Sequence, residues 1–325
     1  MEREPTIDEV RAARVIVDRY LPHAPLEHSP LLSKELDAEI FLKIESFKPT
    51  RAFKARGALN RIAALDAEGR RRGVVAASAG SHAQGVAWAA WTLGTPAIVV
   101  MPSGVSDTIV GVCRAYGAEV ILEGEVFDEA QVRARAIERE QGRTFIHPYA
   151  DTLIVAGQAT IGLELLDELP ELDLVIVAVG GGGLSGGIAL AVRSGRPDAR
   201  VVGVEPEGAD AVQRSVAAGR PVVLERPQSV ADKLVARTTE PLAIELGRKY
   251  IHEYVTVSER ALENATYEFL ERLSLLVEPS GAAPLAAIRE GKVAVKGLRA
   301  VLVCSGGNVS PQLLGRIIAE RAVRQ

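Results

Sequence analysis

The sequence is poor in cysteine and in aromatic residues, and it carries no excess of positive charge. The two cysteines, Cys113 and Cys304, lie far apart among 325 residues, so the chain is not built on a disulfide framework. Aromatic residues make up 4% of the chain and the formal net charge is -4, which offers a nucleic acid neither a basic field nor a stacking surface. We expect no nucleic-acid partner.

Long hydrophobic runs are also missing. The apolar stretches are interrupted by glycine or charge, and none approaches the roughly 20 apolar residues that span a bilayer. The N-terminal Met-Glu-Arg-Glu-Pro is too polar for a secretory signal. We therefore expect no membrane segment and a cytoplasmic location. With 47% hydrophobic and 25% charged residues, a chain of this length can bury a large core and divide into two domains.

What the sequence does contain is an alternation of apolar strand patterns with helix patterns. Thr6 and Glu9 form a capping box that predicts a first helix to about Leu21. Strands are predicted at 39–44, 73–77, 97–101, 119–122, 144–146, 172–179, 200–205 and 298–304. Helices are predicted at 54–65, 82–93, 107–116, 127–141, 153–169, 184–194, 209–218, 259–275 and 281–290, with a last one from 311. This βαβ order predicts an α/β fold of two lobes, each a mostly parallel twisted sheet flanked by helices.

The stretch 49–57, Pro-Thr-Arg-Ala-Phe-Lys-Ala-Arg-Gly, places Lys54 at the start of a predicted helix. A lysine between Phe53 and Ala55 can be partly desolvated, which lowers its pKa and leaves a nucleophilic neutral amine. A lysine that binds a carbonyl group covalently needs that property. Taken alone, the same residues also fit an ordinary basic helix start.

A run of glycine at 180–187, Gly-Gly-Gly-Gly-Leu-Ser-Gly-Gly, follows an apolar strand and precedes a helix. Glycines allow backbone amides to surround an anion, and the helix N-terminus adds its positive dipole end. This pattern predicts a phosphate-binding loop.

The same loop also satisfies G-x-G-x-x-G through Gly181, Gly183 and Gly186, with Glu205 at the end of the next strand. A nicotinamide-dependent oxidoreductase is therefore an alternative. It gives Lys54 no role, and no paired His and Asp or Arg stands out for hydride chemistry.

Two further polar turns follow apolar strands. The turn at 78–85, Ser-Ala-Gly-Ser-His-Ala-Gln-Gly, leads into an alanine-rich helix, and its hydroxyls and amides suit a substrate carboxylate. An ordinary N-cap with His82 on the surface is the alternative. The turn at 304–309, Cys-Ser-Gly-Gly-Asn-Val, presents Ser305, whose hydroxyl could bond a ring nitrogen.

Together these stretches resemble the fold-type II pyridoxal-phosphate enzymes, and among them the threonine and serine dehydratase (ammonia-lyase) group that includes serine racemase. The resemblance spans nearly the whole chain. It rests on 50–58, 78–85, His147-Pro148, 154–158 (Ile-Val-Ala-Gly-Gln), 180–187, Glu205-Pro206, 278–283 (Glu-Pro-Ser-Gly-Ala-Ala) and 305–309.

The resemblance implies a role for each stretch. Lys54 would bind pyridoxal 5'-phosphate covalently and act in catalysis, Phe53 would pack on the pyridine ring, and Ser305 would meet the ring nitrogen. The implied cofactor-binding residues are Phe53, Lys54, Ser81, Gly180, Gly181, Gly182, Gly183, Leu184, Glu278 and Ser305. The implied substrate-binding residues are Ser78, Ala79, Gly80, Ser81 and His82. A large cofactor-binding domain would comprise 1–45 and 147–325, and a small domain 46–146.

The implied activity is a dehydratase or ammonia-lyase that performs β-elimination on L-threonine or L-serine and gives a 2-oxo acid and ammonia. A racemase of the same fold is an alternative, as is a cofactor-binding protein that has lost catalysis. A homodimer in the cytoplasm is expected from the resemblance.

Several positions depart from the family pattern, among them Ala52 and Ala79, which stand where serine is common. Arg51 and Ser81 stand where a glycine and an asparagine are common, and Lys233 replaces a glycine after Asp232. Two added cations could favour a more polar or anionic hydroxy amino acid, unless both point to solvent. Glu205 and Ala209 fit the divalent-cation pattern of some relatives. Ala211 stands in place of its aspartate, so we expect no metal site.

Overall fold

A computed structural model of the chain describes residues 2–322, which form two compact units. Unit 1 comprises the described residues up to Pro22 together with Lys48–Thr160. Unit 2 comprises His23–Phe47 and the described residues from Ile161 onward. These units assign 147–160 and the N-terminal helix to the same body as 48–146, whereas the sequence-based division places them in the large domain. That functional division stays a prediction.

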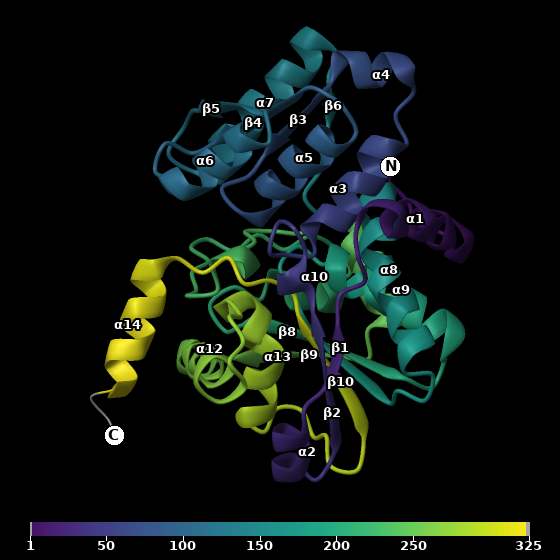
Figure 1. Cartoon of the computed structure of the whole chain (residues 1–325), viewed down its shortest axis with the longest axis vertical. Coiled ribbons are helices and arrows are strands. Elements are labelled where there is room, and N and C mark those ends of the chain that lie inside the picture. Colours follow the sequence, from purple (N-terminus) through teal and green to yellow (C-terminus); the bar gives the residue numbers. More distant parts are fainter. Residues whose placement is uncertain (1, 323–325) are drawn as a thin grey trace. The chain divides into compact units, whose positions relative to one another are not determined.

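Unit 1 contains a four-stranded parallel sheet in the order β5-β4-β3-β6 (Figure 1). Its elements are α1 (Ile7–Tyr20), α3 (Lys54–Ala63), α4 (Ala67–Arg72), β3 (Val74–Ala77), α5 (Ser81–Thr92), β4 (Ala97–Met101), α6 (Asp107–Ala115), β5 (Glu119–Leu122), α7 (Phe127–Gln141), β6 (Thr144–Phe145) and the first turns of α8 (Thr152–Glu168).

Alternation along the strands gives this sheet two apolar faces. Val74 and Ala76 of β3 belong to a core with residues of α3, α5 and α6, whereas Val75 and Ala77 belong to a separate core with α7. Successive side chains of a strand point to opposite faces, so both sides of the sheet are covered by helices.

Unit 2 contains a six-stranded sheet in the order β1-β2-β10-β7-β8-β9, in which the β1–β2 pair is antiparallel and the other pairs are parallel (Figure 1). Its strands are β1 (Leu26–His28), β2 (Glu39–Ile44), β7 (Leu174–Ala178), β8 (Arg200–Pro206), β9 (Glu253–Val257) and β10 (Arg299–Cys304). Its helices are α2 (Pro30–Leu36), α9 (Gly183–Gly195), α10 (Ala211–Ala218), α11 (Pro241–Tyr250), α12 (Glu259–Leu273), α13 (Pro279–Arg289), α14 (Pro311–Ala322) and the short 3-10 turns η1 (Glu45–Phe47) and η2 (Asp232–Leu234).

The main core of unit 2 lies on one face of this sheet. Leu174, Ile176 and Ala178 of β7 pack with side chains of α12 and α13, so the alternate residues Val175 and Val177 face the other side. Helix α9 also contacts β7 and β8. The structure therefore confirms the predicted α/β class with mostly parallel sheets.

The predicted elements are present with ends shifted by a few residues at most, and strands 39–44, 97–101 and 119–122 match in full. Five elements were not predicted: β1, α2, α4, α11 and β9. The segment 219–237, predicted to be irregular, contains only the short turn η2 among its described residues. No helix within residues 2–322 combines the length and the apolar character that a membrane crossing requires.

Candidate active site

Lys54 begins α3, and its amine lies among protein atoms. The Lys54 Nζ donates a hydrogen bond of 2.7 Å to the carbonyl oxygen of Pro148 and lies 5.1 Å from the centre of the Phe53 ring. Burial lowers the pKa of Lys54 to about 8. The neutral, nucleophilic amine is therefore far more populated near neutral pH than it is for an ordinary lysine, as the predicted role requires.

Close helix packing fixes the backbone that carries Lys54. A Cβ added to Gly85 of α5 would lie 3.1 Å from the carbonyl carbon of Lys54. A Cβ added to Gly157 of α8 would lie 2.6 Å from the Cα of Gly57 in α3. At Gly157 only glycine allows this approach, and at Gly85 a side chain would require the backbone of Lys54 to shift, so α5 and α8 hold the first turns of α3 in place. The family motifs at 78–85 and 154–158 include these glycines, but sequence reasoning gave them no packing role.

His82, in the first turn of α5, is buried rather than on the surface. Its Nε2 lies 3.0 Å from the carbonyl oxygen of Ile146, which can only accept a hydrogen bond. Burial and the nearby charge of Lys54 lower the pKa of His82 to about 3, so the ring is neutral and donates from Nε2. His82 therefore connects the turn after β3 to the segment after β6.

The turn before α5 can accept an anion. Ser78 Oγ accepts the N–H of Gly80 at 3.1 Å, and the N-cap Gly80 offers no side-chain cap within the part of the chain that the structure describes. This turn precedes the N-terminus of α5, so the first amides of the helix and the positive end of its dipole point toward the turn. These features fit a substrate carboxylate bound by Ser78, Ala79, Gly80, Ser81 and His82, an assignment that stays a prediction.

The segment after β6 presents the carbonyl that Lys54 contacts. His147 Nδ1 accepts the N–H groups of Tyr149 at 3.2 Å and Ala150 at 2.8 Å, which closes a turn around Pro148. Burial, with the charges of Arg135 and Lys54, lowers the pKa of His147 to about 4, so Nδ1 is free of a proton and can accept. His147 was part of a motif in the sequence, but its role as a turn-closing acceptor was not predicted.

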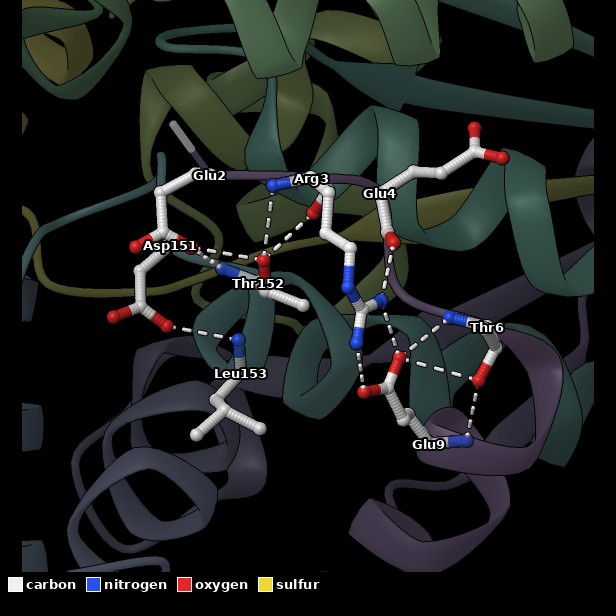
Figure 2. A network of polar contacts seen from close by, with 8 residues as sticks. All are labelled: Glu2, Arg3, Glu4, Thr6, Glu9, Asp151, Thr152 and Leu153. Carbon is white, nitrogen blue, oxygen red and sulfur yellow. Dashed lines mark hydrogen bonds and ion pairs between the residues drawn. The ribbon is translucent and has the colours of Figure 1, made fainter.

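A polar network continues this turn into the start of α8 (Figure 2). Asp151 Oδ1 accepts the N–H groups of Leu153 at 2.8 Å and Ile154 at 3.0 Å, and its Oδ2 pairs with Arg61 Nε at 2.8 Å. The Glu2 carboxylate accepts the N–H of Thr152 at 2.9 Å and its hydroxyl at 2.8 Å. The N-terminal segment and α3 are thus both connected to the beginning of α8. Sequence reasoning missed the Arg61–Asp151 and Glu2–Thr152 contacts of this network, because the partners lie 90 and 150 residues apart.

In unit 2, the glycine loop leads into α9 with close backbone contacts. A Cβ on Gly180 would lie 2.9 Å from the carbonyl oxygen of Lys233, and one on Gly182, whose φ is +89°, would lie 2.8 Å from the Cβ of Ala243. Thr239 Oγ1 donates to the carbonyl oxygen of Gly181 at 3.0 Å. The loop is therefore fixed in one shape that other residue types would not permit.

The same loop fits a phosphate group. The N-cap Gly182 provides no side-chain cap within the described residues, and α9 directs its N-terminal amides toward the loop. A phosphate bound by Gly180, Gly181, Gly182, Gly183 and Leu184 would satisfy these donors and interact favourably with the helix dipole.

Ser305 and Glu278 lie in two segments near the carboxyl ends of β7 and β10. Strand β10 pairs with β7 in parallel, so the residues after Cys304 and after Ala178 leave the sheet at the same edge. Ser305 is buried, and the N–H of Glu278 donates to the carbonyl oxygen of Gly306 at 3.1 Å. The hydroxyl of Ser280 is buried without a hydrogen-bond partner among the described residues. An unsatisfied buried hydroxyl beside the predicted site is consistent with a bound group.

Glu205 serves as a distant cap for α10. Its two carboxylate oxygens accept the N–H groups of Val212 at 2.9 Å and Gln213 at 2.7 Å, and burial raises its pKa to about 8. Ala211 begins α10 and has no ligand oxygen in its side chain. The carboxylate is thus engaged by the protein rather than presented as a metal ligand with Ala209 or to a nicotinamide ribose.

Comparison with known proteins places the chain in a family. The sequence pattern of the family described as "Pyridoxal-phosphate dependent enzyme" matches residues 18–306. The L-threonine ammonia-lyase of Thermotoga maritima is 40% identical over 319 residues, which cover 98% of this chain and 79% of that protein.

Two solved structures have the same fold. The serine racemase of maize has a TM-score of 0.91 at 33% identity, with 98% of each chain covered. The threonine deaminase of T.th. has a TM-score of 0.88 at 40% identity, with 94% of this chain and 99% of that chain covered.

The chain belongs to the pyridoxal-phosphate-dependent enzyme family. The predicted resemblance and the predicted cofactor are confirmed by this membership. The family match also removes the main support for the nicotinamide alternative, whose acidic residue Glu205 is used as a helix cap.

Proposed function

We propose that the protein is an ammonia-lyase that converts L-threonine, and L-serine as a second substrate, to a 2-oxo acid and ammonia. The observation that carries this proposal is the buried amine of Lys54, whose pKa is lowered to about 8, in the same unit as an uncapped helix N-terminus suited to a carboxylate. The choice of threonine is supported by the relatives in Thermotoga maritima and Geobacter sulfurreducens, both named L-threonine ammonia-lyase and both 40% identical.

Pyridoxal phosphate, when bound, withdraws electrons from the α-carbon of an amino acid and so permits loss of its α-proton and β-hydroxyl. In unit 1, Lys54 would bind the cofactor covalently, Phe53 would contact its ring, and Ser81 would lie beside it. In unit 2, Gly180–Leu184 would hold the phosphate, with Glu278 and Ser305 near the ring. These assignments are the roles that the family resemblance implies for this chain.

Lys54 has the chemistry of the base in this scheme. Once its amine is free, it can take the α-proton of the substrate, because burial holds its pKa close to neutral pH. The carbonyl oxygen of Pro148 accepts a hydrogen bond from this amine and so fixes the direction of the lone pair. The amides at the start of α5 would hold the substrate carboxylate, which orients the α-carbon.

Ser305 favours elimination over transfer of the amino group. Its hydroxyl is neutral and can form a hydrogen bond, but it cannot keep a ring nitrogen protonated as a carboxylate would. Charge on the α-carbon is then relieved by departure of the β-hydroxyl, which leaves as water after it gains a proton. Hydrolysis of the released product consumes one water, equal to the one lost in the elimination, and gives the 2-oxo acid and ammonia.

The two departures that add cations differ in the structure. Arg51 is exposed, whereas Lys233 forms an ion pair of 2.7 Å with Glu278. A lysine whose charge is matched by a buried carboxylate offers less attraction to an anionic substituent than an unpaired one. This arrangement supports a neutral hydroxy amino acid as the preferred substrate over an anionic analogue.

One set of measurements tests the proposed function. The purified protein should bind pyridoxal phosphate, and borohydride reduction followed by mass spectrometry should place the label on Lys54. It should then release a 2-oxo acid from L-threonine faster than from L-serine or 3-hydroxyaspartate. Cofactor binding without release of any 2-oxo acid would contradict the proposal.

The racemase alternative is supported by the fold of the maize serine racemase. Chiral chromatography of L-serine incubated with the protein tests it. Conversion to D-serine in excess of keto-acid release would favour racemisation as the main activity.

A homodimer in the cytoplasm completes the proposal. Two buried free cysteines, Cys113 and Cys304, suit a reducing compartment. Light scattering tests the assembly, and a monomeric mass would contradict it.

A further inference from the structure

Lys233 lies in η2 and forms an ion pair with a buried carboxyl group. Its Nζ lies 2.7 Å from Oε2 of Glu278, and the two side chains are 22% and 4% exposed. The same amine lies 3.1 Å from Oδ1 of Asp232 and donates to the carbonyl oxygen of Asn308 at 3.1 Å. The ammonium therefore has three oxygen partners, of which Asp232 is mostly exposed.

These contacts join separate segments of unit 2. Glu278 is the N-cap of α13, and Asn308 follows Ser305 in the loop after β10. The backbone of Lys233 packs on Gly180, the first glycine of the loop before α9. A Cβ added to Gly180 would lie 2.9 Å from the carbonyl oxygen of Lys233. One residue thus contacts the glycine loop, the start of α13 and the loop that carries Ser305.

The charge of Lys233 matters because Glu278 is buried. Burial disfavours both charged forms. The carboxylates of Glu278 and Asp232 outweigh this effect at Lys233 and raise its pKa, whereas at Glu278 burial outweighs the charge of Lys233 and raises the pKa of the carboxyl group. Removal of one partner from a buried pair leaves the other charge without compensation, so the pair resists separation. Glu278 would then take up a proton or move toward water, and the segments held by the ammonium would lose their common partner.

We propose that Lys233 is a positioning residue that holds the glycine loop, Glu278 and the Ser305 loop in the arrangement that binds the cofactor. The inference rests on the proposed function, because it takes these three segments as cofactor-binding. Lys233 itself acts through Glu278 and Asn308 and has no chemical step assigned to it.

The first test measures cofactor affinity by titration of cofactor-free protein with pyridoxal phosphate. We expect Lys233→Met to bind the cofactor about 10-fold or more weakly than the wild type, since a buried carboxylate loses its cation. Lys233→Arg keeps the charge and should recover most of the affinity. The matched control is Lys296→Met, which removes a lysine from an exposed ion pair with Asp37 at 3.1 Å and should bind as the wild type does.

A double-mutant cycle then tests whether Lys233 acts through Glu278. Glu278→Gln should weaken binding in the wild-type background and have a smaller effect when Lys233 is already methionine, because the two residues act as a pair. Thermal unfolding of the cofactor-free variants gives a readout that needs neither cofactor nor activity. Lys233→Met should lower the unfolding temperature, and addition of Glu278→Gln should restore part of the loss.

The outcomes separate this inference from the proposed function. If the wild type fails to bind pyridoxal phosphate, the proposed function is wrong. If the wild type binds and Lys233→Met binds equally well, or if the two substitutions have additive effects on both affinity and unfolding temperature, the positioning role of Lys233 is wrong. A variant that binds weakly but is rescued by arginine supports it.

Discussion

The side-chain amine of Lys54 donates a hydrogen bond of 2.7 Å to the carbonyl oxygen of Pro148, 94 residues further along the chain. The acceptor is a backbone atom of a turn that His147 closes with its own side chain. The amine to which the proposal gives the catalytic role is thereby held by a group that cannot titrate, so the shift of its pKa comes from burial.

Lys54→Ala should abolish turnover of L-threonine. In the proposed function this variant loses the amine that would bind the cofactor and move the α-proton, and loss of a positioned base lowers kcat by about 10²–10⁴-fold. Keto-acid release measured in a coupled assay checks this, with the exposed Lys34→Ala as a control that should retain activity. Turnover by Lys54→Ala near the wild-type rate, without an added amine, would show that another group is the base.

Stability of the cofactor-free protein should rise with pH between about 8 and 10.5, the folded and ordinary pKa values of Lys54. Below this range the amine is protonated in both states, and the folded chain carries a buried charge. Within it, the unfolded chain keeps a proton that the folded chain has released, so the free energy of unfolding increases with pH. The gain is at most about 3 kcal/mol.

Comparison with Lys54→Met isolates this effect, because other titrating groups contribute equally to both proteins. Denaturant unfolding at several pH values gives the difference in the free energy of unfolding between the wild type and Lys54→Met. This difference should increase in favour of the wild type as pH rises through the range. A difference that stays constant would show that the amine is not desolvated in the folded chain.

His147→Ala should lower kcat for L-threonine more than it changes KM. The N–H groups of Tyr149 and Ala150 lose their acceptor, at a cost of about 1–3 kcal/mol for a buried donor, and the turn around Pro148 loosens. Misalignment of the Lys54 amine then affects the proton transfer rather than substrate binding.

Two variants make the His147 test specific. His147→Asn retains a side-chain oxygen that can accept the same N–H groups and should recover part of kcat. His252→Ala removes an exposed histidine and should behave as the wild type. Equal kcat values for His147→Ala and the wild type would mean that the turn keeps its shape without the imidazole.

The sequence predicted those parts of the fold that local patterns control. The capping box of Thr6 and Glu9 begins α1 as predicted, and the apolar runs of β2, β4 and β5 define both ends of those strands. Two of the missed elements have weak local signals. Strand β1 has only 3 residues, and α4 (Ala-Glu-Gly-Arg-Arg-Arg) contains a glycine and no large apolar residue.

For the site too, local motifs were predictable from the sequence and long-range contacts were not. The motifs around Lys54 and Gly180 identified a family, and membership in that family is confirmed. The carbonyl of Pro148 was not predictable, because a backbone acceptor leaves no signal in residue type. The partners of Lys233 were missed for a different reason: Glu278 and Asn308 are 45 or more residues away and meet it only through the sheet topology.

Arg51→Gly should stabilise the protein without a change in its substrate preference. Arg51 has a φ of +56°, in the left-handed region, where a side chain costs about 1–2 kcal/mol and glycine does not. Glycine also loses more conformational freedom on folding, so the net gain in the free energy of unfolding should be roughly 0.5–1 kcal/mol. Because the arginine is exposed, its charge should act weakly on a bound substrate, and the ratio of kcat/KM for L-threonine to that for 3-hydroxyaspartate should stay the same.

Two further substitutions at position 51 separate backbone strain from charge. Arg51→Lys keeps the charge and the strained backbone, so its unfolding midpoint in denaturant should equal that of the wild type. Arg51→Asn should fall between wild type and Arg51→Gly, because asparagine tolerates a positive φ better than arginine does. A loss of stability in Arg51→Gly would mean that contacts of the arginine outweigh its backbone strain. A shift of the kcat/KM ratio toward threonine in Arg51→Gly and Arg51→Asn, but not in Arg51→Lys, would instead show that the positive charge at position 51 acts on the substrate.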